Sequence, residues 1–237
     1  MATTYLTRTP SGSGSQRKFT FSFWVKRSGL SSQQHIFTQY SANSGDRQFR
    51  IEFQANDTMR IYNTDGATDW ILFATNRVFR DTSAWMHIVV AIDTTQSTES
   101  NRVKLYINGV QETSFSSSTY PSLNRDLDIN TTAAQVIGAL SSSSVSSYFD
   151  GSLTHFHFID NTQYQASDFG ETDSTSGIWK PKTSPSVTYG TNGFFLKFEN
   201  SGAMGTDSSG NSNTFTVGGG TLTQNVDTPS NNFATLN

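Results

Sequence analysis

The sequence contains no cysteine. This absence excludes a disulfide framework, a thiolate metal site and a thiol nucleophile. Long apolar runs are missing too, since no stretch approaches the roughly 18 consecutive apolar residues of a membrane-spanning helix. We therefore expect no membrane partner.

Charged residues are scarce. They make up 15% of the chain, compared with about 25% in an average soluble protein. The 16 basic and 19 acidic residues give a net charge of -3, and the basic residues form no cluster. Because nucleic-acid binding needs clustered Lys and Arg to neutralise phosphates, we expect no nucleic-acid partner. Residues 1–15 lack the charged and apolar regions of a secretory signal, so export by that route is not expected.

Aromatic residues are abundant at 13%, with 18 phenylalanines, so large rings must supply most of the core. No stretch repeats apolar residues at i, i+3, i+4 and i+7 over three turns, and little helix is expected. Apolar and polar residues alternate instead. Phe19, Phe21, Phe23 and Val25 fall on one face of a strand and the residues between them on the other, which predicts a strand with one buried face.

Short alternating segments of this kind recur along the chain, separated by clusters of Ser, Thr, Asn and Gly. Residues 48–54 and 58–63 are predicted to form a hairpin, and Asn108-Gly109 is the pair that a type I′ hairpin turn prefers. Many short strands with polar turns predict an all-β sandwich. The remaining predicted strands are residues 69–75, 85–93, 102–110, 134–140 and 149–160.

The chain divides into three parts. Residues 1–169 are predicted to form the sandwich, residues 170–193 an ordered loop or linker, and residues 194–237 a C-terminal strand segment that packs on the same sandwich. Trp179 is predicted to anchor the middle part to a sheet, because a large ring in a polar loop usually packs against the core.

Four segments occur in the order of a LamG-type domain: FTFSFWVKR, AWMHIVVAIDTT, RVKLYINGVQ and YFDGSLTHFHFID. The chain therefore resembles concanavalin A-like (LamG) domains, and the resemblance implies a jelly-roll sandwich of two antiparallel sheets. Trp24 and Trp85 belong to these framework segments, so we exclude them as ligand residues. Fold alone does not fix function.

A closer resemblance is to LamG-like proteins of marine tailed phages, through segments such as SDFGETDSTSGIWKPK, YGTNGFFLKFENSGAMGTDSSGNSNTFTV and DTPSNNFATLN. It covers nearly the whole chain and implies a structural protein on the outer surface of the virion, either a fibre component or a capsid decoration. The implied partners are other virion proteins, a host surface glycan and copies of the chain itself, with a trimer favoured.

Residues 194–200 and the DSSGN turn at 207–211 resemble the opening of a LamG domain, although here they come last. The segment can supply an edge strand to its own sandwich, as a circular permutation would. It can also pair with a neighbouring subunit by strand addition. We favour pairing within the chain.

A glycosidase is the further alternative, because related folds house glucanases. Asp126, Asp128 and Asn130 would project from one face of a strand, as in the Glu-x-Asp-x-Glu strand of family sixteen glucanases. Retaining hydrolysis needs a second carboxylate as general acid, and an amide at Asn130 cannot donate that proton. The sequence also lacks GxSxG, GxxxxGK and HExxH motifs, so no enzymatic activity is expected.

Metal candidates are His155 and His157, which share a strand face opposite Phe156 and Phe158. Two imidazoles at this spacing can bind a metal, and three such pairs around a trimer axis would supply six ligands. The alternative is that they are ordinary exposed strand histidines. The LamG resemblance also implies calcium held by loop carboxylates, and hence a calcium-dependent lectin as an alternative function. The loop candidates for calcium are Asp46, Asp65, Asp150 and Asp207, the last of which could instead cap its own turn.

Glycan binding needs an exposed aromatic platform with polar groups nearby. Tyr40, Trp70, Tyr120 and Tyr148 lie in predicted loops and are the candidates for it. Each could equally be a buried anchor.

Overall fold

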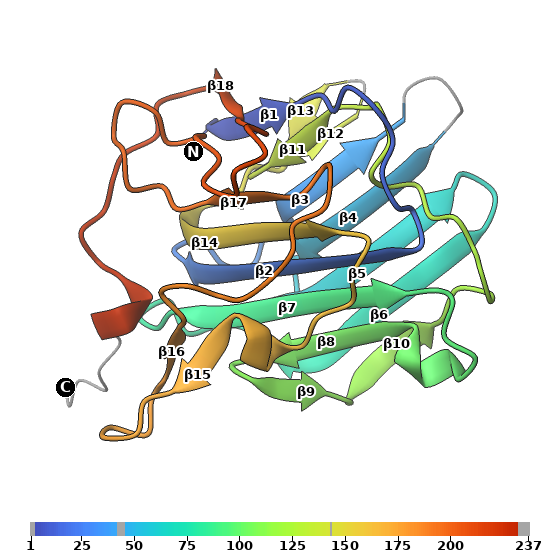
Figure 1. Ribbon diagram of the computed structural model, residues 1–237, viewed down its shortest axis with the longest axis horizontal. Coiled ribbons are helices and arrows are strands. Elements are labelled where there is room, and N and C mark those ends of the chain that lie inside the picture. The colour runs from blue at the N-terminus through green and yellow to red at the C-terminus, as the bar shows by residue number, and fades with distance from the viewer. Residues whose placement is uncertain (1–2, 42–45, 143, 232–237) are drawn as a thin grey trace.

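The computed structural model describes residues 3–41, 46–142 and 144–231. It is a sandwich of two antiparallel sheets (Figure 1). The large sheet has the strand order β10-β6-β5-β4-β3-β11-β1-β18, and the small sheet has the order β17-β14-β2-β7-β8-β9. The prediction of an all-β jelly-roll sandwich is thereby confirmed.

The strands are short and spread along the whole described chain. The large sheet contains β1 (Tyr5–Arg8), β3 (Gln34–Tyr40), β4 (Arg47–Phe53), β5 (Thr58–Asp65), β6 (Asp69–Val78), β10 (Phe115–Thr119), β11 (Gln135–Ile137) and β18 (Thr216–Gly219). The small sheet contains β2 (Lys18–Arg27), β7 (Met86–Asp93), β8 (Val103–Ile107), β9 (Val110–Glu112), β14 (Gly151–Asp160) and β17 (Phe194–Leu196). Two further hairpins pair β12 (Leu140–Ser141) with β13 (Val145–Ser146), and β15 (Gly170–Thr172) with β16 (Trp179–Pro181).

In the part of the chain that the structure describes, helix is limited to three single-turn 3₁₀ helices, Glu99–Asn101, Ala166–Asp168 and Pro229–Asn231. The expectation of little helix is confirmed. No helix in the described ranges is long and apolar enough to cross a membrane.

The core between the sheets consists largely of phenylalanine rings. Phe21 lies at its centre, with ring centroids 4.6 Å from Phe37 of the large sheet and 4.7 Å from Phe158 of the adjacent strand. Phe19 and Phe23 are also fully buried, as the alternation predicts. Each buried ring removes a large apolar area from water and contributes about 1.5–3 kcal/mol, so these few residues dominate the stability of the sandwich.

The outer face of the small sheet is buried as well, and the prediction of one buried face for β2 is wrong. Thr20, Ser22 and Trp24 are nearly inaccessible, because residues 161–193 fold across this face and form a second apolar cluster with it. Trp179 packs against this cluster and donates a hydrogen bond from Nε1 to His87 Nδ1 over 3.0 Å. Its predicted anchoring role is confirmed.

The Asn108-Gly109 turn joins β8 to β9 as predicted. Both residues adopt positive φ, 49° and 84°, as a type I′ turn requires. A Cβ at residue 109 would also lie 2.9 Å from the Trp179 ring, so glycine serves both the turn and the packing of the covering segment.

The C-terminal strands complete one edge of each sheet within the same molecule (Figure 1). β17 pairs with β14, with Phe194 opposite Phe158. β18 pairs with β1, with Val217 opposite Leu6. In the described part of the chain, this segment therefore adds its strands to its own sandwich.

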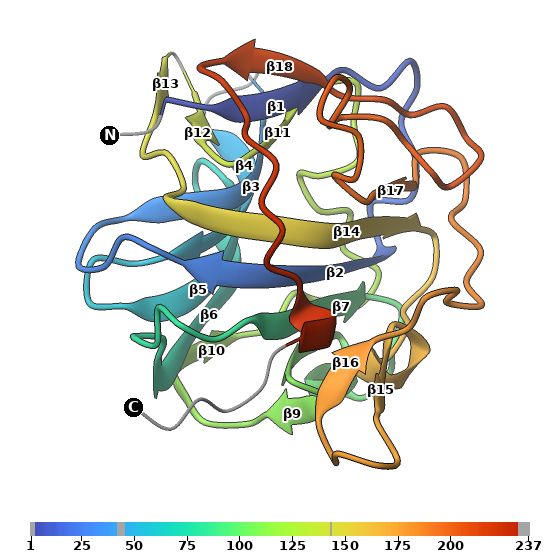
Figure 2. The same cartoon turned by 90° about the vertical axis from the view of Figure 1, so that its left-hand side faces the viewer.

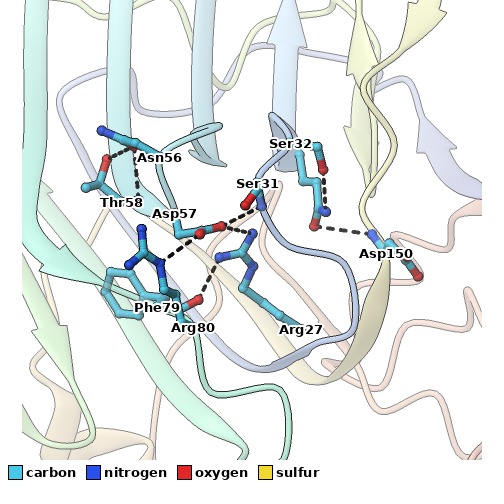
Figure 3. Close-up of polar contacts among 10 residues, drawn as sticks. Arg27, Ser31, Ser32, Asn56, Asp57, Thr58, Phe79, Arg80 and Asp150 are labelled. Carbon is cyan, nitrogen blue, oxygen red and sulfur yellow. Dashed lines mark hydrogen bonds and ion pairs between the residues drawn. The ribbon is translucent and has the colours of Figure 1, made fainter.

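A buried ion pair joins the two sheets at one end (Figure 3). Arg27, at the end of β2, donates to Asp57 Oδ1 over 3.2 Å and to the Phe79 carbonyl over 2.7 Å. Asp57 lies in the β4–β5 turn and also accepts hydrogen bonds from the Ser31 amide and the Arg80 guanidinium. Arg27 has no exposed side-chain area and Asp57 only 2%, whereas Arg80 is 63% exposed. We call this group the arginine clasp.

We predict that Arg27→Met lowers the free energy of unfolding by about 3–5 kcal/mol, because it leaves the Asp57 carboxylate buried without its main partner. The matched change Arg80→Gln removes an exposed arginine from the same carboxylate and should cost less than about 1 kcal/mol. Urea denaturation of both variants measures the difference. Equal losses would show that burial of the pair is not what matters.

Candidate functional site

A groove lies beside the small sheet. Residues 220–228, which we call the strap, leave β18 and pass in front of β14, β2 and β7 (Figure 2). Between the strap, β1 and the beginning of β14 lies a groove of about 490 Å³, which we call the strap groove. Its wall includes Tyr5, Trp85, Phe149, Asp150, Thr154, His155, Lys197, Phe198, Glu199, Gln224 and Asp227.

The strap is fixed at several points along its length. Lys26 Nζ lies 2.7 Å from Asp227 Oδ2, and Gln224 Nε2 donates to the Glu199 carbonyl over 2.9 Å. Leu222 packs against the main core. The strap is therefore an integral wall of the groove.

Two strained residues lie in the groove wall. His155 and Phe198 have φ values of 47° and 60°, in the left-handed region that favours glycine. Of the other non-glycine residues with positive φ in the described chain, five are Asn or Asp and three are Ser. Asn and Asp, like His, adopt this conformation more readily than a bulky residue such as Phe198. Such strain costs about 1–3 kcal/mol per residue and concentrates at functional sites. This clustering marks the strap groove as the candidate site.

The groove combines aromatic surface with many hydrogen-bonding groups. Lys197 and Glu199 carry opposite charges 3.6 Å apart and are substantially exposed. Burial lowers the pKa of His155, with Lys197 adding to the shift, so its imidazole is neutral at pH 7 and can both donate and accept. Neutral donors, acceptors and rings in one depression are the groups that bind polyhydroxylated ligands.

The two predicted metal-binding histidines differ in environment. A β-bulge separates them in β14, and although both imidazoles lie against the Phe195 ring, only His155 lines the groove. His157 is 2% exposed and its Nδ1 lies 2.9 Å from the Tyr189 hydroxyl, so the expectation of an exposed histidine is wrong there. Asp150 lines the groove too. Within the described residues, no group of three His, Cys, Asp or Glu side chains could hold a metal ion.

The calcium candidates are dispersed, and most are occupied by protein donors. Asp207 accepts four hydrogen bonds, including those from the Ser209 and Asn213 amides, so its predicted capping of the DSSGN turn is confirmed. Asp65 accepts hydrogen bonds from the Trp70 indole and from two backbone amides, which lower its pKa to about 2. Asp46 accepts a hydrogen bond from the Tyr40 hydroxyl.

The four predicted glycan-binding aromatics lie outside the groove. The Arg125 guanidinium covers the Trp70 ring at 3.7 Å, and Tyr120 packs edge-on against Phe73 at the core. Tyr148 donates a hydrogen bond to the Val145 carbonyl, and Tyr40 donates to Asp46. Among the described residues they form no common platform.

The sequence pattern did not identify the aromatic residues of the strap groove, and the reason differs from one residue to another. Tyr5 and Phe198 lie in segments that carry no ligand-binding motif, and the fold alone brings them together. Trp85 was excluded as a framework residue, yet it lines the groove while being 3% exposed. One signal was available for Phe198, because it lies near the end of the strand predicted at residues 194–200, just before a Gly-rich and Ser-rich loop.

The expected strand at residues 126–130 is absent from the structure. Leu127 and Ile129 fill the core, while Asp126 is paired with Arg17 on the surface. Asp128 is half-buried, and burial raises its pKa. The glucanase-like arrangement of three side chains on one strand face is therefore wrong.

Asn130 has a structural role in the observed fold. Its Nδ2 donates to Asp160 Oδ1 over 2.7 Å, and its Oδ1 accepts from Asn192 Nδ2 over 2.8 Å. The backbone N–H of Asn192 in turn donates to Asp160 Oδ2. This buried network ties the loop before β11 to the end of β14 and to residues 190–193.

A buried Ser-His pair lies on the outer face of the small sheet. His87 Nε2 is 2.8 Å from Ser22 Oγ, the spacing of a nucleophile and its base. However, Trp179 donates to Nδ1, so the neutral imidazole carries its proton on Nε2 and donates to the serine. A base must accept that proton, and this imidazole cannot. Both residues are also buried beneath the covering segment.

Comparison with known proteins places the chain among LamG-type sandwiches. The family model described as Laminin_G_3, concanavalin A-like lectin/glucanases superfamily, matches residues 2–166. No curated protein matches the sequence. The chain is similar to the native heptameric SAP-like pentraxin of Limulus polyphemus, with 12% identity, a TM-score of 0.51 and coverage of 69% of this chain and 72% of that one. It is also similar to domains LG4-5 of the mouse laminin alpha1 chain, with 14% identity, a TM-score of 0.50 and coverage of 70% and 42%. At these identities the likeness shows the fold alone.

We predict that the protein loses stability between pH 7 and pH 5 through His87. Burial lowers the pKa of His87 to about 3, whereas an unfolded histidine titrates near 6.5. Below pH 6.5 the unfolded chain gains a proton that the folded chain cannot hold, and the free energy of unfolding falls by about 2 kcal/mol at pH 5. His157 shifts in the same direction.

Urea denaturation at the two pH values measures this loss. His87→Gln removes the titrating group while keeping a polar side chain, so it should lose clearly less stability over the same interval. An identical pH dependence in both proteins would contradict the assignment to His87.

Proposed function

The chain belongs to the concanavalin A-like lectin/glucanases superfamily, and from this premise we propose that it is a non-enzymatic glycan-recognition domain displayed on the outer surface of a virion. The observation that carries the glycan part is the strap groove, where aromatic and polar side chains meet around two strained residues. Sugars bind to such combinations through stacking on rings and hydrogen bonds to hydroxyl groups.

The non-enzymatic part is supported by the chemistry of the two arrangements that resemble catalytic ones. Asn130 is committed to a buried network with Asp160 and Asn192. His87 accepts a hydrogen bond from Trp179 on Nδ1, so its proton is on Nε2 and this nitrogen cannot act as a general base toward Ser22. Neither group faces the strap groove.

The virion location is supported by the resemblance to LamG-like proteins of marine tailed phages, which extends over nearly the whole sequence. On this proposal the chain is a fibre component or a capsid decoration. Its partners are other virion proteins and further copies of itself, in a homo-oligomer for which a trimer is favoured. A repeated array would turn weak binding of single sugars into firm attachment through multivalency.

We predict that Lys197→Ala weakens binding of a glycan identified on a glycan array by about tenfold, because a charge-assisted hydrogen bond in the groove is lost. Lys104→Ala removes a lysine from β8, outside the groove, and is the matched control. Titration calorimetry measures both affinities. Binding should be the same with and without a chelator, and chelator-sensitive binding would favour a calcium-dependent lectin instead.

We predict that mass spectrometry of purified virus particles detects this chain in stoichiometric amount with the known structural proteins. Labelling of intact particles by an antibody against the sandwich should follow, since the domain is displayed outward. A chain found in the infected-cell lysate but missing from the particles would defeat the virion assignment.

A further inference from the structure

The outer face of the large sheet carries an arginine-rich group that lies apart from the strap groove. Cross-strand register places Arg50 opposite Tyr62, and Glu52 opposite both Arg60 and His35. Because directly opposed residues share a face, these five side chains stand together on the outside of β3, β4 and β5. We call them the arginine face.

Both oxygens of the one carboxylate in the arginine face, that of Glu52, already have protein partners. Glu52 has no exposed side-chain area. Its Oε1 accepts from the Arg60 guanidinium, and its Oε2 lies 2.6 Å from His35 Nε2 and 3.2 Å from Gln33 Nε2. The β12–β13 hairpin folds over β3 at this side, where the His35 amide donates to the Ser147 carbonyl. Glu52 therefore has no remaining capacity to neutralise a second arginine.

Arg50 is that second arginine. Its side chain is only 15% exposed, and the nearest carboxylate oxygen of a described residue, Glu52 Oε2, is 3.9 Å from its Nη1. In the described ranges its guanidinium donates no hydrogen bond to a carboxylate, carbonyl or amide oxygen. Its one side-chain hydrogen bond is with Tyr62, and its Nε is buried without a partner. A largely buried cation with so few acceptors is costly unless an anion satisfies it.

The surroundings of Arg50 hold its guanidinium in place. The Arg50 Cζ lies 4.5 Å from the centroid of the Tyr62 ring, and the Tyr62 hydroxyl donates a hydrogen bond to Asp69 Oδ1. Further along the same row of the sheet, Leu72 is half-buried and Thr119 is exposed at the edge. Neighbouring strands thus place the guanidinium of Arg50, the apolar side chain of Leu72 and the hydroxyl of Thr119 in this order across the sheet.

We propose that the arginine face binds a sugar residue bearing a carboxylate. The carboxylate forms two parallel hydrogen bonds with the planar guanidinium of Arg50, a geometry that lysine or a neutral donor does not reproduce. The sugar ring then lies toward Leu72, with its hydroxyl groups directed to Thr119. This site is separate from the strap groove, so the protein would hold two different subsites for glycans.

The test uses trigalacturonate and its fully methyl-esterified form, in which each carboxylate has lost its charge and gained a methyl group. The wild-type protein should bind the free acid at least tenfold more tightly than the ester. Arg50→Gln should abolish this preference, and Arg50→Lys should restore only part of it. Microscale thermophoresis gives the affinities, and thermal unfolding checks that each variant is folded.

Arg17→Gln is the matched control, because it removes a surface arginine elsewhere in the sandwich; its affinity should stay within twofold of the wild type. Lys197→Ala, in the strap groove, should also retain binding of trigalacturonate, which separates this proposal from the groove proposal. Equal binding of acid and ester, unchanged affinity in Arg50→Gln, or no binding of trigalacturonate at millimolar concentration would overturn the site. Tighter binding of a sulfated trisaccharide would assign the arginine face to sulfate instead.

Discussion

Strand β2 is excluded from water on both faces. Its phenylalanine rings face the large sheet, while Ser22 and Trp24 face the covering segment at 161–193. A strand in this position can tolerate polar atoms only when each has a partner, and Ser22, His87 and Trp179 satisfy one another in a chain of two hydrogen bonds. The small sheet thereby becomes the middle layer of the protein. On our proposals, glycans bind in the strap groove beside the beginning of β14 and on the outer face of the large sheet.

The strand pattern could be predicted because it depends on local alternation. Phe19, Phe21 and Phe23 face the core, and the Asn108-Gly109 turn adopts positive φ, since both properties are set within a few residues. The burial of the other face of β2 could not be predicted in the same way. It depends on a segment about 140 positions later, and the small, moderately polar residues of that face fit either environment.

The functional surfaces were harder to predict for the same physical reason. Trp70, Tyr120 and Tyr148 carry the right chemistry, but tertiary contacts with Arg125, Phe73 and Val145 occupy them. His155 was identified by its spacing from His157, yet its place in the groove results from a β-bulge that alternation does not reveal. At the arginine face, alternation correctly directs Arg50 and Glu52 outward. It does not indicate that Arg60, His35 and Gln33 converge on Glu52 and bury it.

The pairing of β1 with β18 sets a condition on how the protein is made. Thr4 and Thr221 lie 217 positions apart and are joined by a hydrogen bond. During synthesis the edges of β1 and β14 emerge long before the strands that cover them, and an uncovered edge readily pairs with another chain. Closing so long a loop is also slow. We therefore expect the nascent chain to be most exposed to aggregation in the interval before β17 and β18 cover these edges.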